Sequence, residues 1–198
     1  SSFNSLRVER RRMLLGIISD THDNVAAVER AVAAFDERGV DTVVHCGDYI
    51  APPVLPFLEG LTVHGVLGNN DGELDGLEAG FRALGNGSVL HGRFAALSLD
   101  GVDVAVLHGE DRYRVAELAA SGDYDLVCYG HHHEAEVRDV DGTTVCNPGA
   151  QFPTVAARTR TARDRSSRRP PSDPPLARRR SGRAGTSVVA RTAGARGR

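Results

Sequence analysis

Five short segments of the chain carry side chains that could bind metal ions. In each segment an aspartate, asparagine or histidine follows an apolar run and stands near a glycine or threonine. Carboxylate, imidazole and amide ligands in combination suit Mn²⁺, Fe or Zn²⁺ better than Mg²⁺ or Ca²⁺. The segments are Asp20-Thr21-His22, Gly47-Asp48, Gly68-Asn69-Asn70-Asp71, His108-Gly109 and Gly130-His131-His132-His133.

Each segment alone has a simpler explanation. Asp48 could cap a following helix, Asn69-Asn70-Asp71 could form a turn, and His108 could lie on the surface. The adjacent histidines could be a surface accident or the remains of a tag. Their joint occurrence at the ends of predicted strands favours one common site. Three histidines without such neighbours are expected to be structural: His45, His64 and His91.

The apolar runs before these segments predict the strands that position them. Strands are expected over 13–19, 41–48, 61–71 and 125–133, and hairpins over 93–110 and 135–150, around Asp100-Gly101 and Asp141-Gly142. Helices are expected over 25–38, 51–60, around 77–84 and over 112–120. This order predicts an α/β domain of two sheets with helices outside. The carboxyl ends of parallel strands share one edge of a sheet, so we expect the five segments to converge there.

In this order, Asp-x-His, Gly-Asp, Gly-Asn, His-Gly and Gly-His-x-His resemble the motifs of the calcineurin-like metallophosphoesterases. The contexts "SDTHDN", "HCGDY", "VLGNND" and "NPGA" are most similar to the small YfcE-type phosphodiesterases, over roughly residues 13–154. The resemblance implies a two-sheet αββα sandwich, although we do not recognise the family's terminal strands in this chain. It implies a dinuclear metal-dependent phosphoesterase, and first of all a phosphodiesterase.

The resemblance also implies how the ligands divide between two metal ions. One ion would be bound by Asp20, His22, Asp48 and His133, and the other by Asp48, Asn69, His108 and His131. Asp48 would bridge the ions, and a metal-bridging hydroxide would attack phosphorus in line. The catalytic role is assigned to Asp48, Asn69 and His108. We expect two divalent ions, Mn²⁺ first, with Zn²⁺, Fe or Ni²⁺ as alternatives.

Two positions near these ligands need a separate explanation. We expect His132 to be a spacer, because its side chain would point away from those of its neighbours in an extended segment. Asn70 stands where many family members have a histidine, and an asparagine cannot donate a proton as an acid. This difference favours substrates with good leaving groups, or proton delivery by water.

The alternative to an enzyme is a non-catalytic binding scaffold with the same fold, as in a retromer subunit whose metal-site edge is degraded. All seven ligand positions hold ligand-competent residues here, which favours the enzyme. We expect a small phosphodiester or phosphomonoester as substrate. Nucleic acid would be bound only non-specifically, through the basic end of the chain, and homo-oligomer formation is left open.

Charge divides the chain into three parts. Residues 13–154 carry 23 acidic residues and 7 arginines, whereas residues 155–198 carry 13 arginines and two aspartates. We expect a flexible extension over 1–12, the phosphoesterase domain over 13–154 and a disordered Arg/Pro-rich tail over 155–198. An altered reading frame would also produce such a tail, and the sequence leaves this alternative open.

Apolar runs are too short for a membrane span or a signal peptide. No run reaches about 18 residues, and the first residues lack an apolar segment. We therefore expect a cytoplasmic protein, whose three cysteines are buried free thiols: Cys46, Cys128 and Cys146.

Overall fold

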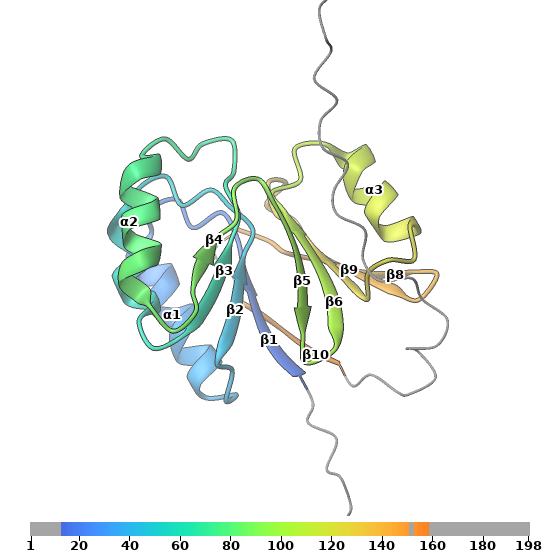
Figure 1. Cartoon of the computed structure of the whole chain (residues 1–198), viewed down its shortest axis with the longest axis horizontal. Coiled ribbons are helices and arrows are strands. Elements are labelled where there is room, and N and C mark those ends of the chain that lie inside the picture. The colour runs from blue at the N-terminus through green and yellow to red at the C-terminus, as the bar shows by residue number, and fades with distance from the viewer. Residues whose placement is uncertain (1–12, 151–152, 159–198) are drawn as a thin grey trace, which may run out of the picture.

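Figure 1 shows two β-sheets packed face to face, with helices on the outer side of each sheet. The computed structural model describes residues 13–150 and 153–158. One sheet has the strand order β10-β1-β2-β3-β4, and the other has the order β5-β6-β7-β9-β8. These layers confirm the predicted αββα sandwich.

The first sheet is mainly parallel. Its strands are β1 (Met13–Ile18), β2 (Thr42–His45), β3 (Thr62–Gly65), β4 (Val89–Leu90) and β10 (Thr154–Arg158). The strands β1 to β4 pair in parallel, whereas β10 pairs antiparallel with β1. The connections between the parallel strands form α1 (Val25–Asp36), the 3-10 helix η1 (Pro52–Leu58) and α2 (Leu74–Leu84), which cover the outer face.

The second sheet contains both predicted hairpins. Its strands are β5 (Phe94–Leu99), β6 (Val102–Leu107), β7 (Leu126–Cys128), β8 (Ala135–Val140) and β9 (Thr143–Pro148). The hairpin pairs β5·β6 and β8·β9 are antiparallel, while β6, β7 and β9 run parallel to one another. The helix α3 (Arg112–Ala120) connects β6 to β7 and packs on the outer face of this sheet.

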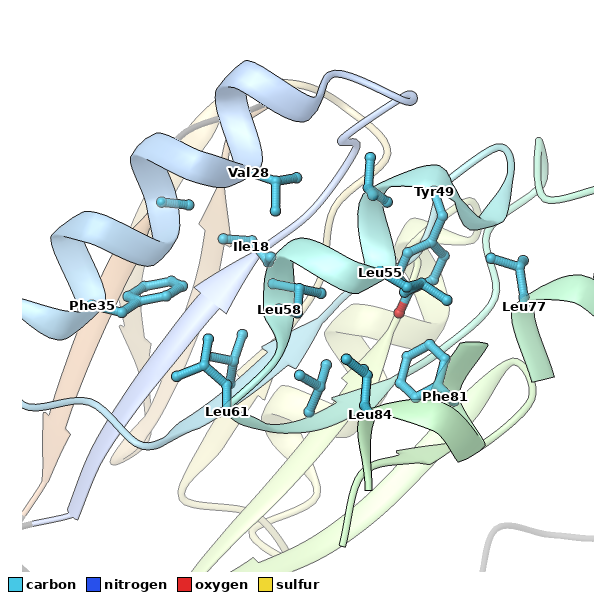
Figure 2. Close-up of a cluster of buried hydrophobic side chains, with 14 of the residues drawn as sticks. Ile18, Val28, Phe35, Tyr49, Leu55, Leu58, Leu61, Leu77, Phe81 and Leu84 are labelled. Carbon is cyan, nitrogen blue, oxygen red and sulfur yellow. The ribbon is translucent and has the colours of Figure 1, made fainter. Parts of the chain in front are cut away.

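The first apolar cluster lies between the helices and the first sheet (Figure 2). The side chain of Asn24 caps α1 by accepting a hydrogen bond from the Ala27 N–H at 3.0 Å. Val28 and Phe35 then share one face of α1 because they lie two helical turns apart, and both are buried. Other members of the cluster come from β1, η1 and α2: Ile18, Leu55, Leu58, Leu77 and Phe81.

A second cluster fills the space between the two sheets. Leu15 and Ile17 belong to it, whereas Ile18 of the same strand faces the helices. Successive side chains of a strand point to opposite faces, so a strand that is covered on both faces must be apolar throughout. This explains the uninterrupted run Met13–Ile18. The strands of the second sheet contribute residues such as Val104 and Leu126.

The strand β10 corrects one expectation. We predicted no recognisable strand after residue 154, yet β10 pairs with β1 from Ile17↔Thr154 to Met13↔Arg158, and Ala156 packs against the cluster between the sheets. The predicted domain boundary at 154 therefore falls on the first residue of a strand. The segment has too few apolar residues to be recognised alone, because its stability comes from pairing with a distant strand. The predictions for 1–12 and for 159–198 lie outside the described residues.

Other predictions about the strands need smaller adjustments. The strands before the ligand segments end earlier than expected, at His45, Gly65 and Cys128, and the two-residue strand β4 was not predicted. The three cysteines are buried and free, as expected. Within the described ranges, none of the helices combines the length and apolar character that crossing a membrane would require.

Candidate metal centre

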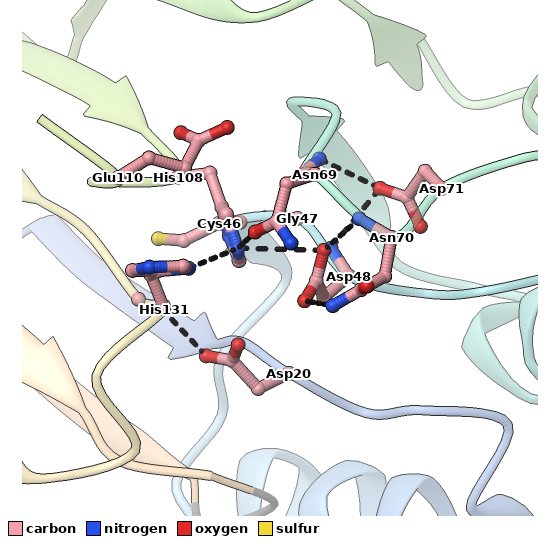
Figure 3. A network of polar contacts seen from close by, with 12 residues as sticks. Asp20, Cys46, Gly47, Asp48, Asn69, Asn70, Asp71, His108, Glu110 and His131 are labelled. Carbon is pink, nitrogen blue, oxygen red and sulfur yellow. Dashed lines mark hydrogen bonds and ion pairs between the residues drawn. The ribbon is translucent and has the colours of Figure 1, made fainter.

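The five ligand segments meet where the strands of both sheets end. Asp20 follows β1, Asp48 follows β2 and Asn69 follows β3, while His108 and the histidine segment follow β6 and β7 of the other sheet. Figure 3 shows side chains from all of these segments turned toward one another: Asp20, Asp48, Asn69, His108 and His131. Convergence at the carboxyl ends was predicted, but the edge belongs to two stacked sheets and not to one.

One half of the centre surrounds the carboxylate of Asp20. Its Oδ1 atom lies 3.2 Å from His133 Nε2 and 4.0 Å from His22 Nε2. His22 Nε2 in turn lies 3.2 Å from Asp48 Oδ2. Asp20 Oδ2 accepts a hydrogen bond from the His131 N–H at 3.0 Å, whereas Oδ1 is buried without a hydrogen-bond partner. A buried carboxylate oxygen that faces two imidazoles without a hydrogen bond fits a cation-binding site.

The other half surrounds His108 Nε2. This atom lies 3.1 Å from Asn69 Oδ1, 3.3 Å from Asp48 Oδ1 and 3.3 Å from His131 Nδ1. The opposite ring nitrogen, Nδ1, donates to the Cys46 carbonyl at 2.7 Å. In the neutral form of the ring, with its proton on Nδ1, Nε2 would have the lone pair that a metal ligand requires.

Asp48 takes part in both halves, with one carboxylate oxygen in each. Its Oδ1 also accepts from the Asn70 backbone N–H at 2.9 Å, and its Oδ2 from the Asn70 side-chain amide at 2.7 Å. Burial alone would raise the pKa of the Asp48 carboxyl, but hydrogen bonds from His108 and Asn70 outweigh burial and hold this pKa well below its usual range. The carboxylate is therefore ionised at neutral pH, as a bridging ligand must be.

The pKa of His108 is shifted in the opposite direction to that of Asp48. Burial alone would lower its pKa, but the hydrogen bond with Asp48 and the Cys46 carbonyl outweigh burial, and the pKa is raised. The negative charges of Asp48 and Asp20 therefore favour a positive charge at the position of the His108 ring.

The backbone of the centre is strained. Asp20, His22, Asp48, His131 and His133 all have positive φ, between 44° and 68°. A residue other than glycine in this left-handed region is uncommon, and such conformations persist where the surrounding structure imposes them. Five of the seven predicted ligands thus owe the direction of their side chains to a left-handed backbone conformation that is uncommon for any residue with a Cβ atom.

Two glycines let the ligand segments approach closely. A Cβ atom on Gly68 would overlap Asp48 Oδ1 and lie 2.6 Å from the Asp48 nitrogen. A Cβ atom on Gly130 would overlap Ser19 Oγ and lie 2.6 Å from Asp20 Oδ2. Both positions require glycine because no larger residue fits beside the predicted ligand.

Asp71 holds the loop that carries Asp48. It accepts backbone hydrogen bonds from Asp48 at 3.0 Å, Ile50 at 2.9 Å and Gly68 at 2.7 Å. The sequence placed Asp71 in a segment of metal-capable side chains, with a turn as the simpler explanation, and did not predict this supporting role.

His45 joins two ligand loops from inside the protein. Its Nδ1 accepts from the Gly47 N–H at 3.2 Å, and its Nε2 lies 3.1 Å from Thr21 Oγ1. Thr21 stands between Asp20 and His22, and Gly47 precedes Asp48, so one buried imidazole fixes both segments. Burial and the nearby His108 lower the pKa of His45 to about 3. It is therefore neutral and structural, as predicted.

The remaining predicted residues are placed as follows. His64 and His91 pair with each other at 3.1 Å, away from the centre. His132 lies apart from the ligands, and its Nε2 accepts from Arg112 Nε at 3.1 Å. The cause of this separation differs from the one that was expected. The strand β7 ends at Cys128, and left-handed residues on both sides of His132, not an extended segment, separate its side chain from theirs.

Two groups of donor atoms in this part of the chain could each hold an ion. Asp20, His22 and His133 form one group and Asp20, Asp48 and His108 the other, and the donor atoms of each group lie within 4.8 Å of one another.

The sequence model of a protein family, the calcineurin-like phosphoesterase superfamily domain, matches residues 13–163. The chain belongs to this superfamily. The identification made from the motifs is thereby confirmed.

Similar proteins agree with this assignment. Phosphodiesterase MJ0936 of Methanocaldococcus jannaschii is 34% identical over 139 residues, which cover 69% of this chain and 83% of the relative. A solved structure described as a novel archaeal phosphodiesterase is also 34% identical, with a TM-score of 0.66, and the match covers 70% of this chain and 84% of that one. The phosphoesterase YfcE from E. coli, 19% identical with a TM-score of 0.52 over 76% of this chain and 84% of its own, shares the fold.

Proposed function

We propose that this metallophosphoesterase is a phosphodiesterase with two divalent metal ions. The observation that carries the proposal is the arrangement around Asp48, which offers one carboxylate oxygen to each of two clusters of N and O donors. The relatives at 34% identity described as phosphodiesterases support the same reaction.

The residues present fit two ions. Asp20, His22, Asp48 and His133 would hold one, with the unpartnered Asp20 Oδ1 as a ligand. The second would be held by Asp48 and a second set of donors: Asn69, His108 and His131. Two ions bound there would make water a nucleophile near neutral pH and offset the charge that develops on a phosphoryl group. The mixed N and O donors favour Mn²⁺, with Zn²⁺, Fe and Ni²⁺ as the alternatives to be compared.

The protein itself contributes a rigid, ionised set of ligands. Asn70 uses both its backbone and its side-chain amide to hold Asp48, and an amide does not act as a proton donor in acid catalysis. Protonation of the leaving group is therefore left to water, and phosphodiesters with weakly basic leaving groups are expected to react fastest. A non-catalytic scaffold is the alternative function, and it would have no turnover.

The test combines metal analysis with turnover of bis(p-nitrophenyl) phosphate. The protein is stripped with EDTA and reloaded with Mn²⁺, and two equivalents of metal are expected together with hydrolysis. Asp48→Asn should lose activity by at least about 1,000-fold, because it removes the charge that serves both ions. Asp41→Asn is the matched control, since this exposed aspartate lies before the other end of β2. A folded wild-type protein without bound metal, or a fully active Asp48→Asn variant, would refute the proposal.

A further inference from the structure

A cavity of about 360 Å³ lies beside the histidine segment and belongs to none of the roles assigned so far. Its wall combines charged groups with an aromatic ring and an aliphatic side chain: Arg112, Val115, Tyr129, His132, Glu134 and Arg138, with Glu136 and Ala135 completing it. The cavity is bordered by the start of α3, the end of β7 and the start of β8. A cavity of this size accommodates part of a small organic molecule.

The cavity and the proposed metal centre are both lined by residues of the histidine segment. His131 and His133 turn toward the ligands, whereas His132 between them lines the cavity. The ring centroids of His131 and His132 are 5.0 Å apart. A substrate whose phosphodiester group lies at the centre would therefore place its neighbouring groups at or near this cavity.

The two arginines of the cavity wall differ in whether a carboxylate lies beside them. The guanidinium of Arg138 donates to Glu136 Oε1 at 2.9 Å, and the hydroxyl of Tyr129 donates to Glu136 Oε2. That cation is therefore offset by a carboxylate of the same wall. The burial of Tyr129 and its hydrogen bond to Glu136 raise the pKa of Tyr129 to about 12, so this ring stays neutral.

Arg112 differs from Arg138. It donates through Nε to His132 Nε2 at 3.1 Å, and no carboxylate in the described part of the chain lies within ion-pair distance of it. The neighbouring Asp111 accepts hydrogen bonds from the Tyr113 and Arg114 backbone N–H groups, so its charge is directed to the start of α3. The two terminal nitrogens of Arg112 have no hydrogen-bond partner among the described residues. A guanidinium fixed through Nε presents these nitrogens in the geometry that binds a phosphate.

We propose that this cavity binds a second phosphate group of the substrate, with Arg112 as its ligand and His132 as the residue that positions the guanidinium. The inference rests on the proposed function and specifies its substrate class, namely phosphodiesters that carry an additional phosphate. Glu134 lines the same cavity, and its charge opposes the binding of an anion there. Tyr129 and Val115 supply an apolar wall for the organic part of the substrate.

A pair of matched substrates tests this inference in the Mn²⁺-loaded full chain. One is a dinucleoside monophosphate, and the other is the same compound with a terminal 5′-phosphate. The wild type should have a kcat/KM about tenfold or more higher for the phosphorylated compound, as a charge-assisted hydrogen bond provides. Arg112→Ala and Arg112→Gln should bring the ratio of the two kcat/KM values to about one, through KM. Glu134→Gln should increase the ratio.

Arg114→Ala is the matched control. Arg114 lies on the same helix, forms an ion pair with Glu117 at 3.4 Å and does not line the cavity, so the ratio should stay at the wild-type value. Equal kcat/KM values for the two substrates in the wild type would overturn the inference. So would an Arg112→Ala variant that lowers both values by the same factor, since Arg112 would then only support the ligand segment. Hydrolysis of bis(p-nitrophenyl) phosphate but of neither dinucleotide would overturn the inference and leave the proposed function standing, whereas hydrolysis of none of the three would overturn both.

Discussion

The chain reverses between strands at both ends of the sandwich, but the residues at the reversals differ between the two ends. At the end away from the centre, the reversals use residues that favour left-handed backbone. Gly39 and Gly60 precede β2 and β3, and Asp100-Gly101 and Asp141-Gly142 connect the hairpin strands. A side chain added at Gly39, Gly60 or Gly101 would meet no atom within 4 Å.

At the metal-centre end most of the left-handed residues are not glycines. Aspartates and histidines occupy left-handed conformations there, while Gly68 is enclosed by Asp48 and Gly130 by Ser19 and Asp20. The left-handed backbone is held by hydrogen bonds such as the three that Asp71 accepts from backbone N–H groups. Local conformational preference therefore shapes one end, whereas contacts between distant segments shape the other end and direct its side chains toward one point.

The largest expected effect is a difference in activity loss between variants of neighbouring histidines. His131→Ala and His133→Ala should each reduce the hydrolysis of bis(p-nitrophenyl) phosphate by at least about 1,000-fold, because each removes a proposed metal ligand. His132→Ala should lose at most about tenfold, because it removes one hydrogen bond outside the ligand set. Turnover and bound metal are measured together for all three variants. Equal losses would mean that the two proposed ligands are wrongly assigned.

The next prediction compares two glycines near the same loop. Gly68→Ala should reduce activity by about 100-fold and lower the free energy of unfolding by about 1–3 kcal/mol, because the new methyl group displaces the Asp48 carboxylate. Gly72→Ala should change neither quantity much, since a Cβ atom there meets nothing within 4 Å and its backbone is not left-handed. Urea unfolding and steady-state kinetics provide the two readouts. Similar behaviour of the two variants would show that close packing at Gly68 is unimportant.

His45 provides a prediction about pH. Its pKa in the folded protein, about 3, lies below the ordinary 6.5, so below pH 6.5 the unfolded chain binds a proton that the folded protein excludes. Stability from this group is therefore lost as the pH falls from 6.5 toward 3, by up to about 1.4 kcal/mol per pH unit. Between pH 7 and pH 5, the metal-free wild type should lose about 2 kcal/mol more than His45→Gln.

The measurement for this prediction is urea unfolding of both proteins at the two pH values, after removal of metal. His45→Gln should already be less stable at pH 7, because it weakens the links to Thr21 and Gly47. If both proteins lose the same stability between pH 7 and pH 5, His45 is not held neutral in the folded state.

The smallest effect is expected at the opposite end. Gly101→Ala should cost about 1–2 kcal/mol in the free energy of unfolding, because its φ of 79° is unfavourable for a residue with a side chain. The kcat/KM for bis(p-nitrophenyl) phosphate should stay within about twofold of the wild type, since this turn lies at the far end of β6 from His108. Thermal unfolding and kinetics at a temperature below the transition are sufficient. A large loss of activity would show that the two ends are coupled.

Much of the fold could be predicted because its signals are local. Apolar runs marked β1, β2, β3, β6 and β7, an N-cap and helical spacing marked α1, and Asp-Gly dipeptides marked both hairpins. The strand β10 was missed because its five residues carry no such signal and are ordered by pairing with β1, about 140 residues earlier in the chain.

The amino-acid sequence by itself determined which residue types stand at the ends of the strands, and the order of the motifs was enough to identify the superfamily. Only the tertiary structure decided how these residues are used. It placed the ligand segments of two different sheets at one edge and gave Asp71 and His45 their supporting roles. It also turned His132 away from its neighbours toward Arg112. The physical reason is that side-chain direction at these positions depends on left-handed backbone and long-range hydrogen bonds, which no short stretch of sequence specifies.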